Sequence, residues 1–165
     1  SNGPFNGRAF AVGVSFNGLL YLIGGCGGPQ CSDEKEQILV SATGAFWDVV
    51  QVLGYANAPT DFLWSSSLFQ GSTRVMGIVH DGSIFVVGGK AESRVARLYS
   101  HTFGAIYLTI GYVSQIPMQT GGSWREGGVM LSYLGSLWIL GGMSSTGDRG
   151  NEVLRSPDNG LQWTR

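Results

Sequence analysis

The sequence has little charge. Asp, Glu, Lys and Arg make up 13% of its 165 residues, where soluble domains carry about 25%. The formal net charge is −1. A balance this close to neutral leaves no basic surface for nucleic acid or anionic lipid, so we expect neither as a partner. Low charge combined with 12% aromatic residues predicts that part of the surface is covered by something else.

Long apolar runs are also missing. Residues 9–32 and 98–124 contain no charged side chain, but Gly, Ser, Asn, Gln and Pro interrupt both every few residues. Neither stretch holds the roughly 20 apolar residues that a membrane-spanning helix requires, so we expect no membrane insertion. The chain begins Ser-Asn-Gly-Pro, without a basic or apolar leader, and we interpret it as a mature product or an excised segment.

Cysteine and histidine are scarce, with two of each. Four residues separate Cys26 from Cys31, and His80 and His101 lie far along the chain, so we expect no zinc site and no cofactor. Two uses of the cysteines remain open. They either close a small disulfide loop, which favours an extracellular compartment, or stay as free thiols.

What the sequence does contain is a short segment written three times. An apolar-aromatic-apolar run ending in Gly-Gly occurs at 19–25, 83–89 and 136–142, and its Gly pairs are Gly24-Gly25, Gly88-Gly89 and Gly141-Gly142. A turn signal precedes each copy: Asn17-Gly18, Asp81-Gly82 and Leu134-Gly135. Short β-branched and aromatic runs around such a turn predict a hairpin. A fixed recurring unit predicts a repeat architecture.

Each unit contains four short runs, which we name strands A to D, and none shows helical periodicity. The expected organisation is an arm at 1–7, a first unit at 8–52, a long connection at 53–73 that holds an extra strand or an ordered lid, a second unit at 74–115, a connection at 116–124 and a third unit at 125–165. This predicts an all-β protein built of three four-stranded antiparallel sheets.

A second signal repeats in the hairpin between strands C and D. The third unit carries Ser156, Asp158, Gly160 and Trp163. The first carries Ser41, Thr43, Gly44 and Trp47, and the second Ser100, Thr102, Gly104 and Tyr107. Short Ser, Thr and Asp side chains bond neighbouring backbone amides, and Gly takes the positive φ. We expect the aromatic residue, like Tyr21, Phe85 and Trp138 of the strand B runs, to pack one sheet against the next.

Together these motifs resemble the kelch repeat of β-propellers over nearly all of residues 8–165. The hairpin at 156–163 is similar to the Asp-box of sialidase-like propellers. Kelch propellers usually have more blades than three, and the Asp-box pattern is complete only in the third unit.

The number of blades is itself a prediction about assembly. Propellers are closed rings of about four to eight blades, so three leave two sheet edges and two apolar faces uncovered. The chain is then part of a longer protein, pairs with a second copy to form a six-bladed ring, or joins a larger assembly. We favour assembly with a second copy or another protein partner.

The resemblance also implies where a ligand binds. In kelch propellers the D–A and B–C loops share one face that commonly binds peptides, which here means the loops 26–37, 90–94 and 143–151. Candidate binding residues are Arg8, Arg74 and Arg125, which precede each strand A, together with Arg94, Arg149, Trp64 and Trp124. Arginines can hold a carboxylate bidentately, and exposed Trp can stack on sugars. Alternatively, the arginines bond the loop carbonyls of a neighbouring blade and the Trp side chains pack under loops.

Catalysis is not expected. A sialidase-like site needs a Tyr–carboxylate pair that cannot be picked out, and two His leave little for a galactose-oxidase-like copper site. Asp33, Glu34 and Glu36 form either a calcium-binding cluster or an ordinary solvated loop. We therefore expect a module for protein interaction or self-assembly, and the alternative is a glycan-binding or sialidase-like propeller.

Overall fold

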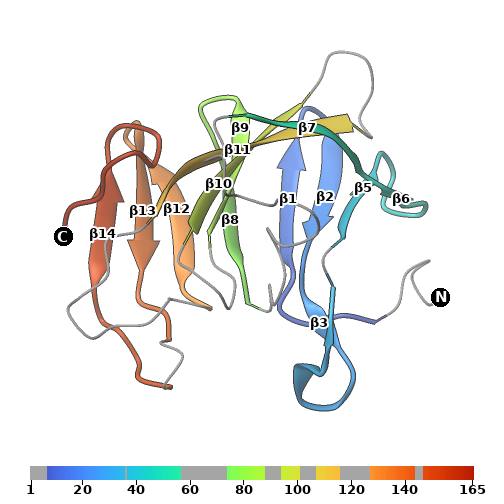
Figure 1. Ribbon diagram of the computed structural model, residues 1–165, viewed down its shortest axis with the longest axis horizontal. Coiled ribbons are helices and arrows are strands. Elements are labelled where there is room, and N and C mark those ends of the chain that lie inside the picture. Colours follow the sequence, from blue (N-terminus) through green and yellow to red (C-terminus); the bar gives the residue numbers. More distant parts are fainter. Residues whose placement is uncertain are drawn as a thin grey trace.

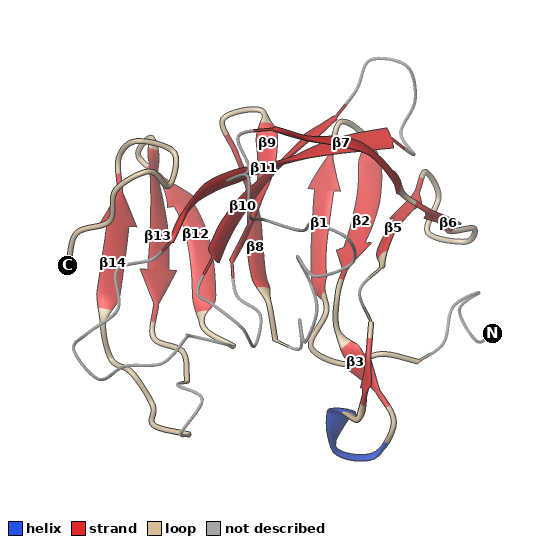
Figure 2. Cartoon of the chain, viewed as in Figure 1, coloured by secondary structure: helices blue, strands red, loops and turns tan. Residues whose placement is uncertain are grey.

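The computed structural model describes residues 7–35, 37–56, 74–87, 94–100, 107–115, 127–143 and 147–165. In this described part the regular elements are strands and one short 3-10 turn, η1 (Pro29–Cys31). Three main sheets lie side by side (Figures 1 and 2). The expected all-β fold of blade-like sheets is therefore confirmed. No helix among the residues described is long and apolar enough to cross a lipid bilayer.

The first sheet is antiparallel, with the order β1-β2-β5-β6. Its strands are β1 (Val12–Phe16), β2 (Leu19–Ile23), β5 (Ile38–Ser41) and β6 (Asp48–Val49). Asn17 and Gly18, with φ of 51° and 76°, join β1 to β2. Two successive positive φ angles are typical of a two-residue hairpin turn, as the Asn-Gly signal predicts. Between β2 and β5 the chain forms a small ribbon of β3 (Cys26–Gly27) and β4 (Asp33–Glu34).

The second sheet has five strands rather than the expected four. Its order is β8-β9-β10-β11-β7. The strands are β8 (Met76–His80), β9 (Ser83–Val87), β10 (Arg94–Ser100), β11 (Tyr107–Gln115) and β7 (Gln51–Ala56). The extra strand expected in the connection is β7. It begins at Gln51, inside the range assigned to the first unit, and pairs in parallel with β11. Pairing of this kind covers a long edge that β11 would otherwise expose.

The third sheet has three strands, β12 (Val129–Tyr133), β13 (Ser136–Leu140) and β14 (Val153–Ser156). The expected fourth strand at 161–165 is reduced to a single bridge between Arg155 and Thr164, with two 2.8 Å hydrogen bonds. The amide of Gln162 instead donates to Asp158 Oδ1 at 2.9 Å. A side chain that takes up a backbone amide in this way competes with the sheet ladder.

The Gly-Gly pairs of the first and third units have the same backbone conformation. Gly24 and Gly25 have φ of 65° and 92°, and Gly141 and Gly142 have φ of 62° and 108°. Their hydrogen bonds also match: Gly24 N to Gln37 O (3.2 Å), Gly141 N to Glu152 O (2.9 Å), Lys35 N to Gly25 O and Gly150 N to Gly142 O (both 2.8 Å). Each pair therefore ends a strand and ties down the loop that follows. Gly88 and Gly89 lie outside the described residues.

Two hydrophobic clusters lie between the sheets. One joins the first sheet to the second through residues such as Tyr21 and Ile84, and the other joins the second to the third through residues such as Phe85 and Leu137. The first strand of the second sheet, β8, contacts β1 across one boundary and β12 across the other. A Cβ atom at Gly77 would lie 2.8 Å from Cγ1 of Val12, so at this point only glycine allows the approach.

Candidate binding surface

The first strands of the three sheets begin on one side of the molecule, where the small ribbon and the loop before β14 also lie (Figure 1). We call this side the loop face, made up of residues 7–11, 24–35, 74–75, 127–128 and 141–143. Residues 147–152 continue it. Loops that project from packed sheets are where proteins commonly place binding residues. The loop at 90–94 lies outside the described residues, except for Arg94, the first residue of β10.

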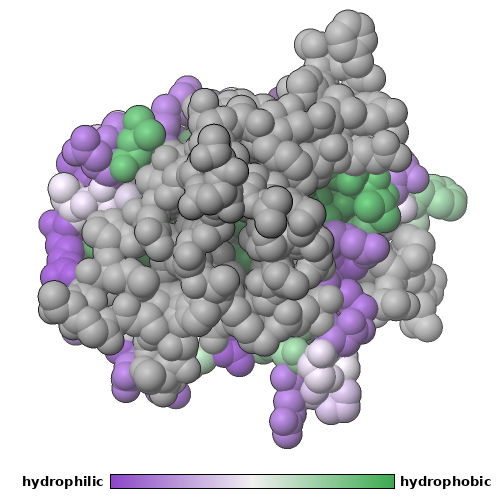
Figure 3. Space-filling model, viewed as in Figure 1, coloured by the Kyte–Doolittle hydropathy of each residue, from purple (hydrophilic) through white to green (hydrophobic). Residues whose placement is uncertain are grey.

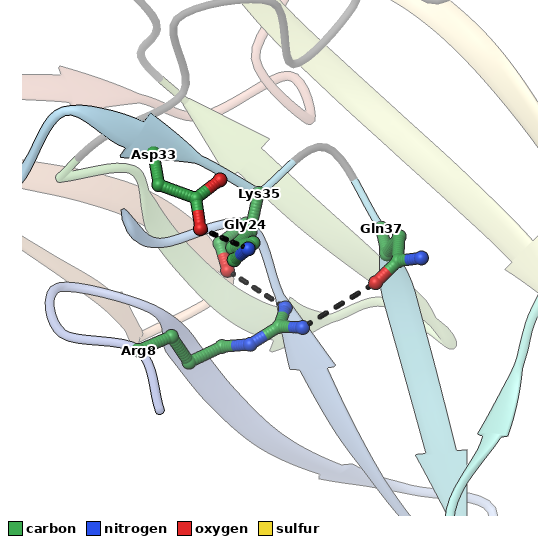
Figure 4. A network of polar contacts seen from close by, with 5 residues as sticks. All are labelled: Arg8, Gly24, Asp33, Lys35 and Gln37. Atoms are coloured by element: carbon green, nitrogen blue, oxygen red, sulfur yellow. Dashed lines mark hydrogen bonds and ion pairs between the residues drawn. The ribbon is translucent and has the colours of Figure 1, made fainter. Parts of the chain in front are cut away.

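Arg8 lies inside the first unit rather than across a sheet boundary (Figure 4). Its Nη1 donates to the carbonyl oxygen of Gly24 at 3.1 Å, and its Nη2 lies 3.5 Å from Oε1 of Gln37. Both partners flank the ribbon, which Lys35 and Asp33 also tie by an ion pair. Arg8 thus binds the loop of its own unit.

Partial burial lowers the pKa of the Arg8 guanidinium, and the negative charge of Asp33 opposes that shift. An arginine keeps its proton in either case, since its ordinary pKa lies far above neutral pH. The hydrogen bonds to Gly24 and Gln37 direct the guanidinium into the protein. Arg8 is therefore positioned to stabilise the loop face.

Two contacts of Cys26 hold the ribbon in place. Cys26 and Cys31 form a disulfide, with Cα atoms 5.0 Å apart. Ala9 forms a bridge with Cys26 through hydrogen bonds of 2.7 and 2.9 Å between their backbone atoms. Of the two uses left open by the sequence, the structure contains the disulfide. The result is a short, closed projection on the loop face.

Arg74 and Phe10 form a pair where the first and second sheets meet. The guanidinium carbon of Arg74 lies 5.2 Å from the centre of the Phe10 ring, which is 54% exposed. Both residues have positive φ, 65° and 57°. A positive φ is uncommon for a residue with a large side chain, and such conformations occur often at functional sites.

When the units are aligned at their hairpin turns, the arginines before the first strands no longer occupy equivalent positions. Asn17 and Asp81 align the first two units, which places Arg74 at the position of Phe10 rather than of Arg8. The third unit has Gly127 at that position, with φ of 66°. The chain therefore enters each first strand through a left-handed residue, and only the third unit uses the residue type that adopts this conformation freely.

The other candidates are spread over the described part or lie outside it. Arg149 is exposed and forms a bridge with Met143 in the loop before β14. The side chain of Arg94 lies outside the described part, as do Arg125, Trp64, Trp124 and Glu36. Within the residues that the structure describes, no group of three or more His, Cys, Asp or Glu side chains is placed to hold a metal ion.

The hairpins after β5 and β14 share a hydrogen-bonding pattern. Ser41 Oγ accepts from the amide of Gly44, and Ser156 Oγ accepts from that of Gly160, both at 2.8 Å. The indole of Trp163 donates to the Gly160 carbonyl at 3.0 Å, and Trp47 makes the matching bond to Gly44 at 2.9 Å. These residues shape the turns on the side away from the loop face (Figure 1).

No protein-family model matches the chain, and no curated protein matches it. Among solved structures, the chain is similar to YjhT, with a TM-score of 0.69 and 15% sequence identity. The similarity covers 98% of this chain and 52% of that one, so this chain spans about half the length of its structural neighbour. At this identity the likeness concerns the fold alone.

Sequence reasoning missed Phe10 and expected Arg8, Arg74 and Arg125 to share one role. Aligning the turns residue by residue would have revealed the difference, because Phe10 then falls on Gly127 of the third unit. That alignment does not reveal the pairing of Phe10 with Arg74. The two side chains meet because neighbouring sheets pack with their first strands side by side.

Proposed function

We propose that this chain is a kelch-like β-propeller module that binds a protein partner through its loop face, and that it is not an enzyme. The observation that carries this proposal is the Phe10–Arg74 pair. Arginine and aromatic residues are enriched among the residues that dominate binding energy in protein interfaces. Both residues have a positive φ at the position where the chain enters the first strands, so the repeat itself places the two side chains on the loop face.

The chemistry of the pair suggests the chemistry of the ligand. An arginine stacked on an aromatic ring offers a planar set of donors beside an apolar surface. An acidic side chain next to an apolar one, as found in many peptides, satisfies both. The disulfide-closed ribbon supplies a firm edge close to the pair, because Ala9 bonds to Cys26 and Phe10 follows Ala9. The disulfide also favours an oxidising compartment for this module.

Glycan binding is the alternative. Aromatic rings stack on sugars, and arginine binds sugar carboxylates. A sialidase-like cluster of three arginines is disfavoured, because Arg8 is engaged with Gly24 and Gln37 and Arg74 occupies a different position of the repeat.

Two parallel screens test the proposal: selection of a displayed library of random peptides on the immobilised protein, and a glycan array. We expect selected peptides rich in acidic and aromatic residues, with affinity reduced at least about tenfold by Arg74→Ala or Phe10→Ala. Leu161→Ala, which changes an exposed residue in the turn after β14, is the matched control and should bind normally. Specific sugar binding lost in Arg74→Ala would favour the alternative. Peptides indifferent to both variants would overturn the loop-face proposal.

A further inference from the structure

The ribbon of β3 and β4 projects from the loop face with little packing of its own. Cys26 is buried, with 1% of its surface exposed, whereas every residue from 27 to 33 is at least partly exposed. The ribbon protrudes at the lower edge of the molecule, where its surface is mostly hydrophilic (Figure 3). Hydrophobic burial therefore holds the base of the ribbon at Cys26, but it does not hold the tip.

The tip has a backbone conformation that needs support. Gly28, Gln30 and Cys31 all have positive φ, at 72°, 54° and 61°. Such angles are uncommon for residues that carry a side chain, as Gln30 and Cys31 do. The disulfide joins Cys31 at this tip to the buried Cys26. It is thus the covalent link between the exposed tip of the ribbon and its base.

The corresponding loop of the third unit is built without a disulfide. Met143 stands at the position of Cys26, and both cysteines of the chain belong to the first unit. The base of the loop is nevertheless closed in the same way, because the amide of Gly150 donates to the carbonyl oxygen of Gly142 as another amide does to Gly25. Closing the base of such a loop does not require a disulfide. The disulfide of the first unit therefore supports the part of the loop beyond its base.

The ribbon also holds the segment that carries Phe10. Ala9 and Cys26 exchange backbone hydrogen bonds of 2.7 and 2.9 Å, and Sγ of Cys26 lies 3.8 Å from the carbonyl oxygen of Ala9. Phe10 follows directly. Arg74 is fixed from another side, where its carbonyl oxygen accepts the amide hydrogen of Gly127 at 2.9 Å. The Phe10–Arg74 pair therefore depends on the ribbon for one partner and on Gly127 for the other.

We infer that the Cys26–Cys31 disulfide is a redox switch for the loop face: the oxidised ribbon holds Phe10 beside Arg74, and reduction by a dithiol releases the ribbon and weakens binding. This inference rests on the proposed function, because it concerns the regulation of the same surface. The module then binds its partner in an oxidising compartment, where disulfides persist, and loses much of its affinity in a reducing one.

The reduction begins at Cys31, because this residue is partly exposed whereas Cys26 is buried. A thiolate of the dithiol attacks Sγ of Cys31, forms a mixed disulfide and releases Cys26 as a thiolate, which takes up a proton. The second thiol of the reductant then displaces Cys31 from the mixed disulfide. Two electrons and two protons pass from the reductant to the protein, which gains two thiols while the reductant becomes a disulfide.

Hydrogen exchange of single amides, measured by NMR before and after treatment with dithiothreitol, tests the coupling without any partner. We expect the amides of Ala9 and Cys26 to exchange at least about tenfold faster in the reduced protein, because their mutual hydrogen bonds open more often. The amides of Gly141 and Gly150 make the matching bonds around the Gly-Gly pair of the third unit and should be unchanged. Labelling of two thiols by iodoacetamide confirms the reduction.

Two results of this experiment would overturn the inference. One is equal protection of the Ala9 and Cys26 amides in the oxidised and reduced protein, because the disulfide then holds nothing that reaches Phe10. The other is a folded protein in which dithiothreitol leaves the disulfide intact, because the proposed switch then has no second state.

Binding is measured with peptides selected on the loop face, defined as those that Arg74→Ala weakens. We expect reduction to weaken their binding about tenfold, as it does when one chain in ten keeps the competent loop face. The double variant Cys26→Ala with Cys31→Ala should bind as weakly as the reduced protein and should not respond to dithiothreitol. Leu161→Ala retains the disulfide and should respond like the wild type. Full affinity in the reduced protein would refute the switch.

A thermodynamic cycle tests the route through Phe10. Reduction and Arg74→Ala both remove the same pair, so their effects should not multiply, and Arg74→Ala should weaken binding less in the reduced protein than in the oxidised one. An equal effect of Arg74→Ala in both states would contradict this route. If no peptide depends on Arg74, the proposed function fails, and the exchange rates of Ala9 and Cys26 still decide whether the disulfide controls the loop face.

Discussion

The indole nitrogen of Trp163 donates a 3.0 Å hydrogen bond to the carbonyl oxygen of Gly160, and the bond is buried. Ser156 Oγ accepts from the Gly160 amide in the same turn. The two bonds fix the turn after β14 and direct the indole into the cluster between the second and third sheets. A single side chain thus connects a local turn to the packing of two sheets.

Replacing Trp163 should therefore cost much of the stability. We expect Trp163→Ala to lower the free energy of unfolding by about 3–5 kcal/mol. Trp163→Phe keeps an aromatic ring and loses the hydrogen bond, which should cost about 1 kcal/mol. Urea unfolding followed by circular dichroism measures both. Leu161→Ala is the nearby exposed control, with an expected change within about 0.5 kcal/mol. Equal midpoints for Trp163→Ala and the control would contradict the packing role.

Gly25 should tolerate alanine poorly. Its φ of 92° strains any side chain, and a Cβ there would lie 2.8 Å from the backbone oxygen of Ala9. Gly18 has a similar φ of 76° but open space around it, so Gly18→Ala measures the conformational strain alone, at about 1–2 kcal/mol. We expect Gly25→Ala to lose a further ~1–3 kcal/mol in a thermal or urea unfolding experiment, because the backbone must shift. Equal losses would indicate that the close approach relaxes freely.

Arg8 and Arg149 should differ although the sequence placed both on the binding surface. Arg8→Ala removes the hydrogen bonds to Gly24 and Gln37 and should lower the free energy of unfolding by about 1–2 kcal/mol. Arg149 is exposed in its loop, and Arg149→Ala should change the free energy of unfolding by less than about 0.5 kcal/mol. Thermal unfolding of the two variants, measured side by side, compares their losses of stability. A larger loss for Arg149→Ala would reverse the assignment of Arg8 as the structural arginine.

Asp158 should add a pH dependence to stability. Its pKa is lowered first by the hydrogen bond from the Gln162 amide and also by the one from Ser156, while desolvation opposes the shift. Because the folded-state pKa is the lower one, the unfolded chain takes up the proton first as the pH falls. The stabilisation is therefore complete above the unfolded-state pKa of about 3.9, and it is lost as the pH falls through the folded-state value.

Asp158→Thr tests this prediction, because Thr43 occupies the equivalent position in the first unit and its Oγ1 also accepts a backbone amide hydrogen bond. The melting temperature of the wild type should fall more steeply than that of the variant between about pH 5 and pH 2. Asp158 is only partly buried, so solvent screens its charge and the difference should be small. Parallel curves would show that the carboxylate contributes nothing through its charge.

The repeat made most of the fold predictable. Turn signals, Gly-Gly pairs and alternating apolar runs are local, and each acts through the conformation of a few neighbouring residues. The hairpin from Ser156 to Trp163 was predictable for the same reason, since its hydrogen bonds join residues at most four positions apart. The parallel pairing of β7 with β11 was not, because it joins residues more than 50 positions apart and depends on which edge is left free.

The candidate surface was predictable only as a side of the molecule. The sequence placed Arg8 and Arg74 before their strands, but it could not assign Arg8 to Gly24 or Arg74 to the Phe10 ring. Those contacts depend on the approach of segments from different parts of the chain.

The sequence by itself determined the all-β fold and the repeated units, because the period of its apolar runs and its turn residues act locally. Only the tertiary structure decided which sides of the sheets are covered. Phe16, His80 and Tyr133 stand at one position of the repeat. Their burial differs because the first two face a neighbouring sheet, whereas Tyr133 faces none of the sheets that the structure describes.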